Sequence, residues 1–169
     1  GLNKSQTELV KQAVSDADKY TQHNFGEFFG VFKFKKMKNP IDREAVRTFG
    51  AAVYEQSKDQ VENIQVEGGS AEAVALFLEG FCLASYRFDK YFTKKKDPKI
   101  QNIYTTNKTV KMDDLATIID ATAWARDLVN EPVSYLTAVQ LGNEILEKCG
   151  GTDIKVEVFT KSKIESLKM

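Results

Sequence analysis

The chain has 169 residues, of which 42% are hydrophobic and 28% are charged. This length is enough for one domain, or one domain plus a fragment of another, and for a core that needs no disulfide staples. The 24 basic and 24 acidic residues cancel, so the whole chain has no field that attracts nucleic acid or an anionic membrane.

Cysteine usage and hydropathy predict a cytoplasmic protein. The two cysteines, Cys82 and Cys149, are too few for a disulfide scaffold. No apolar run reaches membrane-spanning length, and no signal peptide is visible. Cys82 lies in an apolar run and is expected to be a small core hydrophobe. The basic clusters Lys33–Lys38 and Lys94–Lys96 are interpreted as solvated charges on loops or strand edges.

The first third of the chain predicts alternating helices and strands. Apolar residues at helical spacing predict a helix over Ser5–Tyr20, and the aromatic run Phe28–Lys35 predicts a strand. Asn39 is expected to cap a second helix that opens at Pro40, with acidic residues at the positive end of its dipole. The predicted buried stripe of this helix is Ile41, Ala45, Val46, Phe49 and Val53.

The next helix is the most apolar segment of the chain. A short strand, Asn63–Val66, leads through Gly68-Gly69-Ser70 into a helix that Ser70 can cap and that we expect to reach Phe92. It is apolar nearly all round, which predicts burial on more than one side. Its predicted stripe is Val74, Leu78, Phe81, Ser85, Phe88 and Phe92, with Phe81 and Phe88 as core anchors.

The second half continues the alternation. It predicts a strand at Ile100–Tyr104, a long helix from Asp113 or Asp114 that Pro132 ends, and a strand at Ile154–Val158. Capping boxes Thr137-x-x-Gln140 and Ser162-x-x-Glu165 predict one helix to Cys149 and another that has barely begun at Met169, as in a truncated chain. This order of elements predicts an α/β layered fold with a mixed, mostly parallel sheet flanked by helices.

No group of residues in the sequence has the spacing expected of a catalytic site. The only histidine, His23, is interpreted as a loop residue. Asp113-Asp114 lies where a helix N-terminus favours negative charge, so we do not assign it to a metal. Cys149 lies at a helix C-terminus, where the dipole disfavours a thiolate. No serine occupies a G-x-S-x-G setting.

Three further features have a structural and a functional interpretation. Gly68-Gly69-Ser70 could cradle a phosphate, but a plain connection to a capped helix explains it without a ligand. Two charged pairs lie among large apolar residues, where structural salt bridges are the first interpretation and a contact between subunits or domains is the second. These pairs are Arg87 with Asp89 and Arg126 with Asp127.

Two motifs resemble the leucyl (cytosol) aminopeptidase family. The family's amino-terminal domain typically ends in a helix with the pattern A-x-G-x-x-L-x-x-Y-x-F-x-x-Y, matched here by Glu79-Gly80, Leu83, Tyr86, Phe88 and Tyr91. The family then shows A-R-D-L-x-N-x-P and L-T-P, matched by Ala125, Arg126, Asp127, Leu128, Asn130, Pro132 and Leu136-Thr137. Ala138 replaces the usual proline. The resemblance covers roughly Gly50–Met169, and its last eleven residues are similar to a segment of the catalytic domain.

The resemblance implies a parent enzyme that hydrolyses the N-terminal residue of peptides, preferring bulky apolar residues such as leucine. Such enzymes use two adjacent divalent metal ions, commonly zinc or manganese, and a metal-bridging water as the nucleophile. Their ligand motifs resemble K-G-x-x-F-D-x-G-G and N-T-D-A-E-G-R-L, and neither string occurs in this chain. We therefore assign no catalytic, cofactor-binding or metal-binding residue and expect this chain alone to be inactive.

The resemblance also implies a domain organisation. We expect residues 1–132 to form a non-catalytic, macrodomain-like amino-terminal domain and residues 133–169 to be the truncated start of the catalytic domain. The implied partners are the protein's own catalytic domain and further copies in a hexamer, with peptides as the parent's substrate and no membrane. Regulation or DNA binding occurs in some members, but the cancelled charge argues against nucleic acid as a partner here. The alternatives are a macrodomain-like binder of nucleotides or ADP-ribose at Gly68-Gly69 and a purely structural interaction module.

Overall fold

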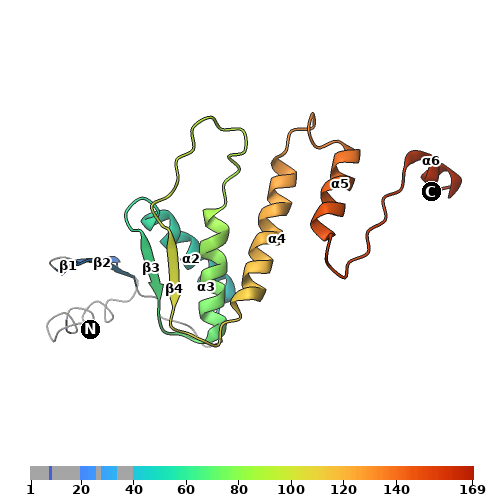
Figure 1. Ribbon diagram of the computed structural model, residues 1–169. Coiled ribbons are helices and arrows are strands. Elements are labelled where there is room, and N and C mark those ends of the chain that lie inside the picture. The colour runs from blue at the N-terminus through green and yellow to red at the C-terminus, as the bar shows by residue number, and fades with distance from the viewer. Residues whose placement is uncertain (1–7, 9–19, 26–27, 34–39) are drawn as a thin grey trace. The chain divides into compact units, whose positions relative to one another are not determined.

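A computed structural model of the chain describes Glu8 and residues 20–25, 28–33 and 40–169 (Figure 1). The predicted helix Ser5–Tyr20 lies outside the described residues except at Glu8, which is helical, and at Tyr20, which begins a strand. The chain divides into two compact units, Gly1–Asp120 and Ala121–Met169. The fold is mixed α/β, rich in helix, with one short parallel strand pair and one antiparallel hairpin.

The hairpin consists of β1 (Tyr20–Phe25) and β2 (Phe28–Lys33), with Tyr20 opposite Lys33 and Phe25 opposite Phe28. β2 confirms most of the predicted strand. The sequence did not predict β1, and the interpretation of His23 as a loop residue is wrong, because its backbone pairs with Gly30. An antiparallel neighbour completes the hydrogen bonds of a polar strand, and a pattern of apolar residues cannot reveal such a neighbour.

The core of the first unit lies around two helices and a parallel strand pair. β3 (Asn63–Val66) and β4 (Asn102–Thr105) pair in parallel, with Asn63 opposite Asn102. The sequence predicted parallel strands but not which strands pair. Helices α2 (Arg43–Ser57) and α3 (Ala71–Ser85) pack against each other beside this pair (Figure 1). The buried apolar residues are Val46, Tyr54, Ala73, Val74, Leu76, Phe77, Leu78, Phe81, Val110 and Leu115.

Two glycines allow α2 and α3 to approach closely. A Cβ atom added at Gly50 would lie 2.2 Å from the carbonyl oxygen of Phe77, and one at Gly80 would lie 2.1 Å from that of Arg47. Aromatic rings of the two helices also pack together, with centroids 5.6 Å apart for Phe49 and Phe77 and 5.3 Å apart for Tyr54 and Phe81. The glycine of the aminopeptidase-like helix motif therefore has a packing role.

The start of α2 differs from the sequence prediction. The helix begins at Arg43, and Asp42 is its N-cap, accepting a hydrogen bond from the backbone N–H of Ala45 at 3.0 Å. Pro40 is therefore not the first helical residue, because the Asp42 side chain caps the helix two residues further on. The predicted cap, Asn39, lies outside the described residues. The predicted stripe is otherwise correct. Val46 is buried and Ile41, Phe49 and Val53 pack against the core, while the stripe extends to Gly50, Tyr54 and Ser57.

The end of α3 also differs from the prediction, which placed it at Phe92. The helix stops at Ser85, whose hydroxyl donates to the carbonyl of Cys82 at 2.7 Å, and Tyr86 adopts an extended conformation. Phe81 is buried as predicted, at 4% exposure. Phe88 is not a core anchor: it is partly exposed in a loop and packs on Tyr91 at 5.8 Å. The charges on either side of Phe88, Arg87 and Asp89, bind other residues of this loop.

Three helices follow β4. α4 (Met112–Asn130) confirms the long helix but starts one residue earlier than predicted and spans the division between the two units. α5 (Ala138–Cys149) has the predicted cap, since Thr137 Oγ1 accepts from the backbone N–H of Gln140 at 3.2 Å. α6 (Lys161–Ser166) begins after Thr160, so the predicted Ser162 capping box is wrong, because Ser162 lies inside the helix.

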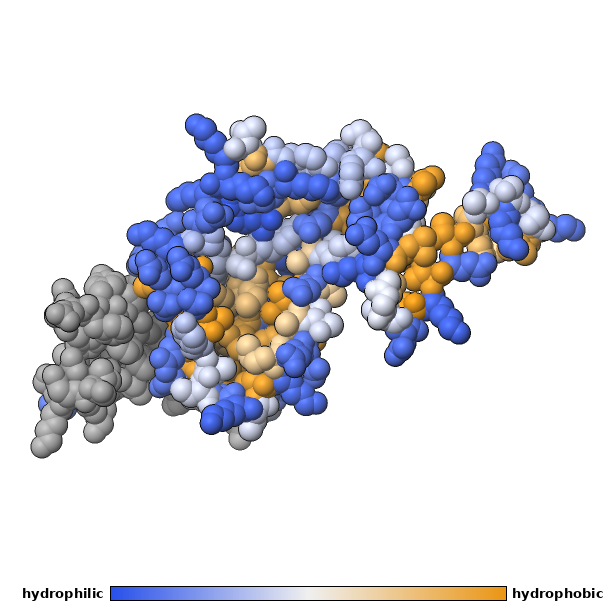
Figure 2. Space-filling view, in the orientation of Figure 1, coloured by the Kyte–Doolittle hydropathy of each residue, from blue (hydrophilic) through white to orange (hydrophobic). Residues whose placement is uncertain are grey.

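The predicted strand Ile154–Val158 is not a strand. Within residues 121–169 there is no other strand with which it could pair. The segment is extended, and the Val158 side chain instead lies over Gly142 of α5, where an added Cβ would meet it at 3.1 Å. In the space-filling view, apolar residues gather on the surface of this extended segment before α6 (Figure 2). No helix of the described residues has the length and apolarity needed to cross a bilayer.

Candidate functional site

The parallel pairing of β3 and β4 brings two loops to one edge of the strand pair. Because parallel strands end at the same edge, the turn Gly68–Ser70 after β3 and the loop Thr106–Lys111 after β4 lie on the same side. In α/β proteins this carboxyl edge is the usual place for a ligand. A binding site in this unit is therefore expected at this edge.

The glycine turn is built to start α3. Gly68 and Gly69 have φ of +79° and +77°, a conformation that other residues adopt at a cost. Ser70 then caps the helix, its hydroxyl accepting from the backbone N–H of Ala73 at 3.2 Å. An added Cβ at Gly68 would meet no atom within 4 Å, whereas one at Gly69 would lie 3.3 Å from Ala73. The glycines thus serve the turn's backbone conformation, in agreement with the structural interpretation of the sequence.

Charges at this edge weaken the case for an anion. Glu72 lies in the first turn of α3, where the positive end of the helix dipole already stabilises its carboxylate, and Glu67 adds a second negative charge just before the glycines. Glu72 also forms an ion pair with Arg43 at 2.7 Å. In the loop after β4, Asn107 Oδ1 accepts from the backbone N–H of Thr109 at 3.1 Å, which shapes a turn without a ligand.

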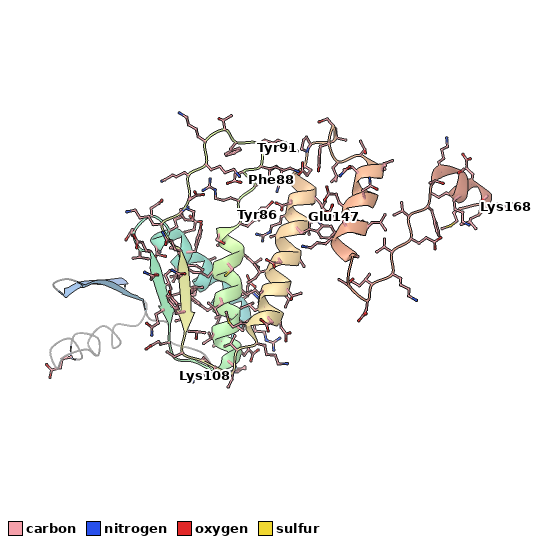
Figure 3. All side chains as sticks on the ribbon, viewed as in Figure 1. Tyr86, Phe88, Tyr91, Lys108, Glu147 and Lys168 are labelled. Atoms are coloured by element: carbon pink, nitrogen blue, oxygen red, sulfur yellow. The ribbon has the colours of Figure 1, made fainter. Side chains whose placement is uncertain are left out.

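One cation at this edge was missed by sequence reasoning. Lys108 lies on the loop after β4, at the end of the strand pair near the start of α3 (Figure 3). It is exposed and far in sequence from Gly68. The signal that could have found it was the prediction of parallel strands, because the residues after each strand then meet. The loop's other lysine, Lys111, pairs with Asp114 at 3.8 Å, and an exposed lysine alone does not define a phosphate site.

The loop between α3 and β4 holds the charged residues of the YRFDKYF motif (Figure 3). Lys95 donates to Asp89 Oδ1 at 2.9 Å, and this hydrogen bond lowers the pKa of the Asp89 carboxyl below its ordinary value. The Arg87 guanidinium donates to the carbonyl of Lys96, whose ammonium pairs with Asp59 at 3.2 Å. These charges therefore tie the loop to itself and to the end of α2, as the structural interpretation predicted.

The other candidate residues do not gather into a reaction centre. Asp113 and Asp114 lie in the first turn of α4, where the helix dipole favours them. Cys82 packs against the core, and burial raises the pKa of its thiol, consistent with a small core hydrophobe. Cys149 ends α5. Arg126 and Asp127 are partly buried on α4.

The donor residues that the structure describes do not fit a dinuclear metal centre. Two adjacent divalent ions need several carboxylate or imidazole ligands that converge on one point. Nowhere in the described part of the chain do three or more His, Cys, Asp or Glu side chains come together. No step of a metal-dependent reaction can be assigned to these residues.

Comparison with known proteins identifies the relatives of the chain. No protein-family model matches it. A probable cytosol aminopeptidase of Clostridium perfringens is 30% identical over 146 residues, covering 76% of this chain and 30% of the relative. One of Treponema denticola is 31% identical over 162 residues, covering 84% of this chain and 32% of the relative. The chain thus spans about 30% of the length of these relatives.

Solved structures share the fold over nearly the whole chain. The bottromycin maturation enzyme BotP matches 99% of this chain and 39% of its own, with a TM-score of 0.69 at 18% identity. A K354E mutant of tomato leucine aminopeptidase matches with the same TM-score and coverage at 16% identity. At such low identity the structural matches establish the fold alone. Together with the curated relatives they confirm the resemblance, and the chain is related to the leucyl (cytosol) aminopeptidase family.

Proposed function

We propose that this chain is the non-catalytic amino-terminal domain of a leucyl-type metalloaminopeptidase, with residues 133–169 as the start of the catalytic domain. The observation that carries the proposal is the match to about 30% of aminopeptidases that are some three times longer. The described residues also bring no metal-ligand cluster together. The catalytic machinery of the parent would then lie in sequence that this chain does not contain.

The parent's activity follows from the relatives' name. It would release the N-terminal residue of peptides in the cytosol, with bulky apolar residues such as leucine preferred. Two divalent ions, zinc or manganese, would supply an activated water in the catalytic domain. Manganese has support from a structural neighbour, since BotP has been solved in complex with Mn. We assign no ligand for these ions to any residue of this chain.

The proposed contribution of this chain is structural. Its first unit, interpreted as macrodomain-like, has its own buried core on α2 and α3 and can hold a fixed surface toward partners. Those partners would be the catalytic domain of the same protein and further copies in a hexamer. The support for the assembly role is the family resemblance.

Activity measurements on the chain alone test this proposal. Purified chain mixed with leucine-p-nitroanilide and manganese should release no more nitroaniline than manganese alone. A full-length relative, such as the Clostridium perfringens protein, serves as the positive control. Turnover that co-purifies with the chain and disappears when the chain is removed by an affinity tag would show that a catalytic site is present, and the proposal would be wrong.

A further inference from the structure

Residues 154–158 have the sequence pattern of a strand but pair with no other strand. Ile154 and Val158 are 63% and 47% exposed, and Figure 2 shows apolar residues gathered on this extended segment. Among the described residues, no backbone hydrogen bond joins the N–H or C=O groups of residues 155–159 to another part of the chain. Unpaired backbone groups beside an apolar face are the features of an open strand edge, to which another strand can be added.

Helix α5 covers part of one face of this segment. The Val158 side chain lies over Gly142 of α5, where an added Cβ would meet it at 3.1 Å. Because side chains alternate along an extended chain, Ile154 and the half-buried Val156 are expected on the same face as Val158, and the polar residues between them on the other. A two-stranded ribbon alone is only marginally stable, but packing on a helix stabilises it. The segment therefore already has the helix on which such a ribbon would pack.

The sequence of the segment is complementary to itself in one antiparallel register. When Val156 lies opposite Val156 of a second copy, Ile154 lies opposite Val158 on the face toward α5. On the other face, the exposed Lys155 lies opposite the exposed Glu157. Two-fold symmetry makes each of these pairs occur twice. Apolar side chains thus meet apolar ones, and opposite charges meet, along the whole ribbon.

The other registers are less favourable. A pair centred on Lys155 or on Glu157 would place like charges directly opposite each other. A shift by one residue would place apolar residues opposite charged ones. Parallel pairing in register would place each charged residue beside its own copy. The charge pattern therefore favours an antiparallel pair of identical chains centred on Val156.

We infer that two copies of this chain associate through residues 154–158, as an antiparallel β-ribbon centred on Val156 that packs on α5 of each copy. This association does not depend on the proposed function, because every residue that it uses lies in the described chain. The ribbon is smaller than a standard protein interface, so we expect a weak dimer with a dissociation constant of about 10–100 µM.

Reversing charges tests the register. Lys155→Glu puts two carboxylates opposite each other at both ends of the ribbon, and Glu157→Lys puts two ammonium groups there. The double variant restores both pairs of opposite charge, and so does an equimolar mixture of the two single variants. Lys163→Glu is the matched control, because it makes the same change of charge as Lys155→Glu at an exposed position on α6, outside the ribbon.

Sedimentation equilibrium between about 5 and 500 µM measures the dimer, and hydrogen exchange over the same range measures the backbone pairing. The amides of residues 155–158 should exchange more slowly as the concentration rises, while those of α3 stay unaffected. Each single variant should weaken association about tenfold or more, because two favourable cross-strand pairs become repulsive. The double variant, the mixture and Lys163→Glu should associate as the original chain does.

Three other results would overturn the inference and leave the proposed function standing. A chain that stays monomeric up to about 500 µM, with residues 155–158 exchanging freely, would mean that the missing neighbour belongs to a longer polypeptide. A dimer that neither single variant weakens would use another surface. If both single variants weaken the dimer but the double variant does not restore it, net charge and not the pairing centred on Val156 controls association.

Discussion

Replacing Gly80 with alanine tests the close approach of α2 and α3. The new Cβ would lie 2.1 Å from the carbonyl oxygen of Arg47 and 2.7 Å from its Cα, whereas ordinary contacts begin at 3.4 Å. The obstructing atoms belong to a backbone that is held by helix hydrogen bonds, so they cannot rotate away. The helices must separate by about 1.3 Å, the difference between 3.4 and 2.1 Å.

Two opposing effects set the magnitude of the loss. Alanine is intrinsically better than glycine inside a helix by about 1 kcal/mol. Overpacking of a core costs about 1–3 kcal/mol or more, and a gap of about 1 Å removes a quarter to a half of the dispersion energy between the separated atoms. The separated atoms here include two pairs of packed rings, Tyr54 with Phe81 and Phe49 with Phe77. We expect a net loss near the upper limit, about 2 kcal/mol after the helix term is subtracted.

Thermal unfolding of the isolated chain, followed by circular dichroism, measures the effect. A loss of about 2 kcal/mol lowers the melting temperature by about 4–8 °C in a protein of this size. Gly142→Ala is the matched control, because it is also a helical glycine but faces only the side chain of Val158 at 3.1 Å. It should leave the main transition unchanged or slightly higher. If Gly80→Ala melts at or above the temperature of the original chain, the helices are not as close as described and the packing argument is refuted.

Three further experiments test the core, the loop after α3 and the glycine turn. Phe81→Ala should cost about 3–5 kcal/mol and Phe88→Ala less than about 1.5 kcal/mol, since only Phe81 is buried; equal losses in urea unfolding would contradict this difference. Lys95→Met should raise the pKa of Asp89, seen by carbon-detected NMR titration. The Lys95–Asp89 pair stabilises the folded chain above pH 3.8, the ordinary pKa of the carboxyl. This stabilisation is lost as the pH falls through the lower pKa that Asp89 has in the folded chain. An unchanged Asp89 pKa would mean that the hydrogen bond does not persist in solution. Calorimetric titration with ADP-ribose should give no saturable heat if Gly68–Ser70 is a structural turn, and low-micromolar binding would favour a nucleotide site.

Sequence patterns predicted the elements whose causes are local. Ser70 and Thr137 are helix caps as predicted, because a cap depends on a hydroxyl and an N–H three residues away. The buried stripe of α2 and the burial of Phe81 were also predictable, since helical spacing alone places those residues on one face. In each case the information needed lies within about one turn of helix.

Elements that depend on distant neighbours were not predictable. The apolar spacing of α3 continues to Phe88, yet the helix ends at Ser85, and Arg87 and Asp89 beyond it bind residues up to nine positions further along the chain. The same limit applies to the candidate site. Lys108 comes to the glycine-turn edge only through the pairing of β3 with β4. The spacing of apolar residues along one segment carries no information about contacts with residues distant in the sequence.

The segment Ile154–Val158 shows why this limit also bears on function. Its alternation of apolar and polar residues is that of a strand with one buried face. A strand needs a neighbour to satisfy its backbone groups, and residues 121–169 offer none. The pattern and the structure are therefore both understandable if the neighbour lies outside this unit. Ile154 and Val129 are 63% and 85% exposed, so the residues of this unit do not cover either apolar side chain.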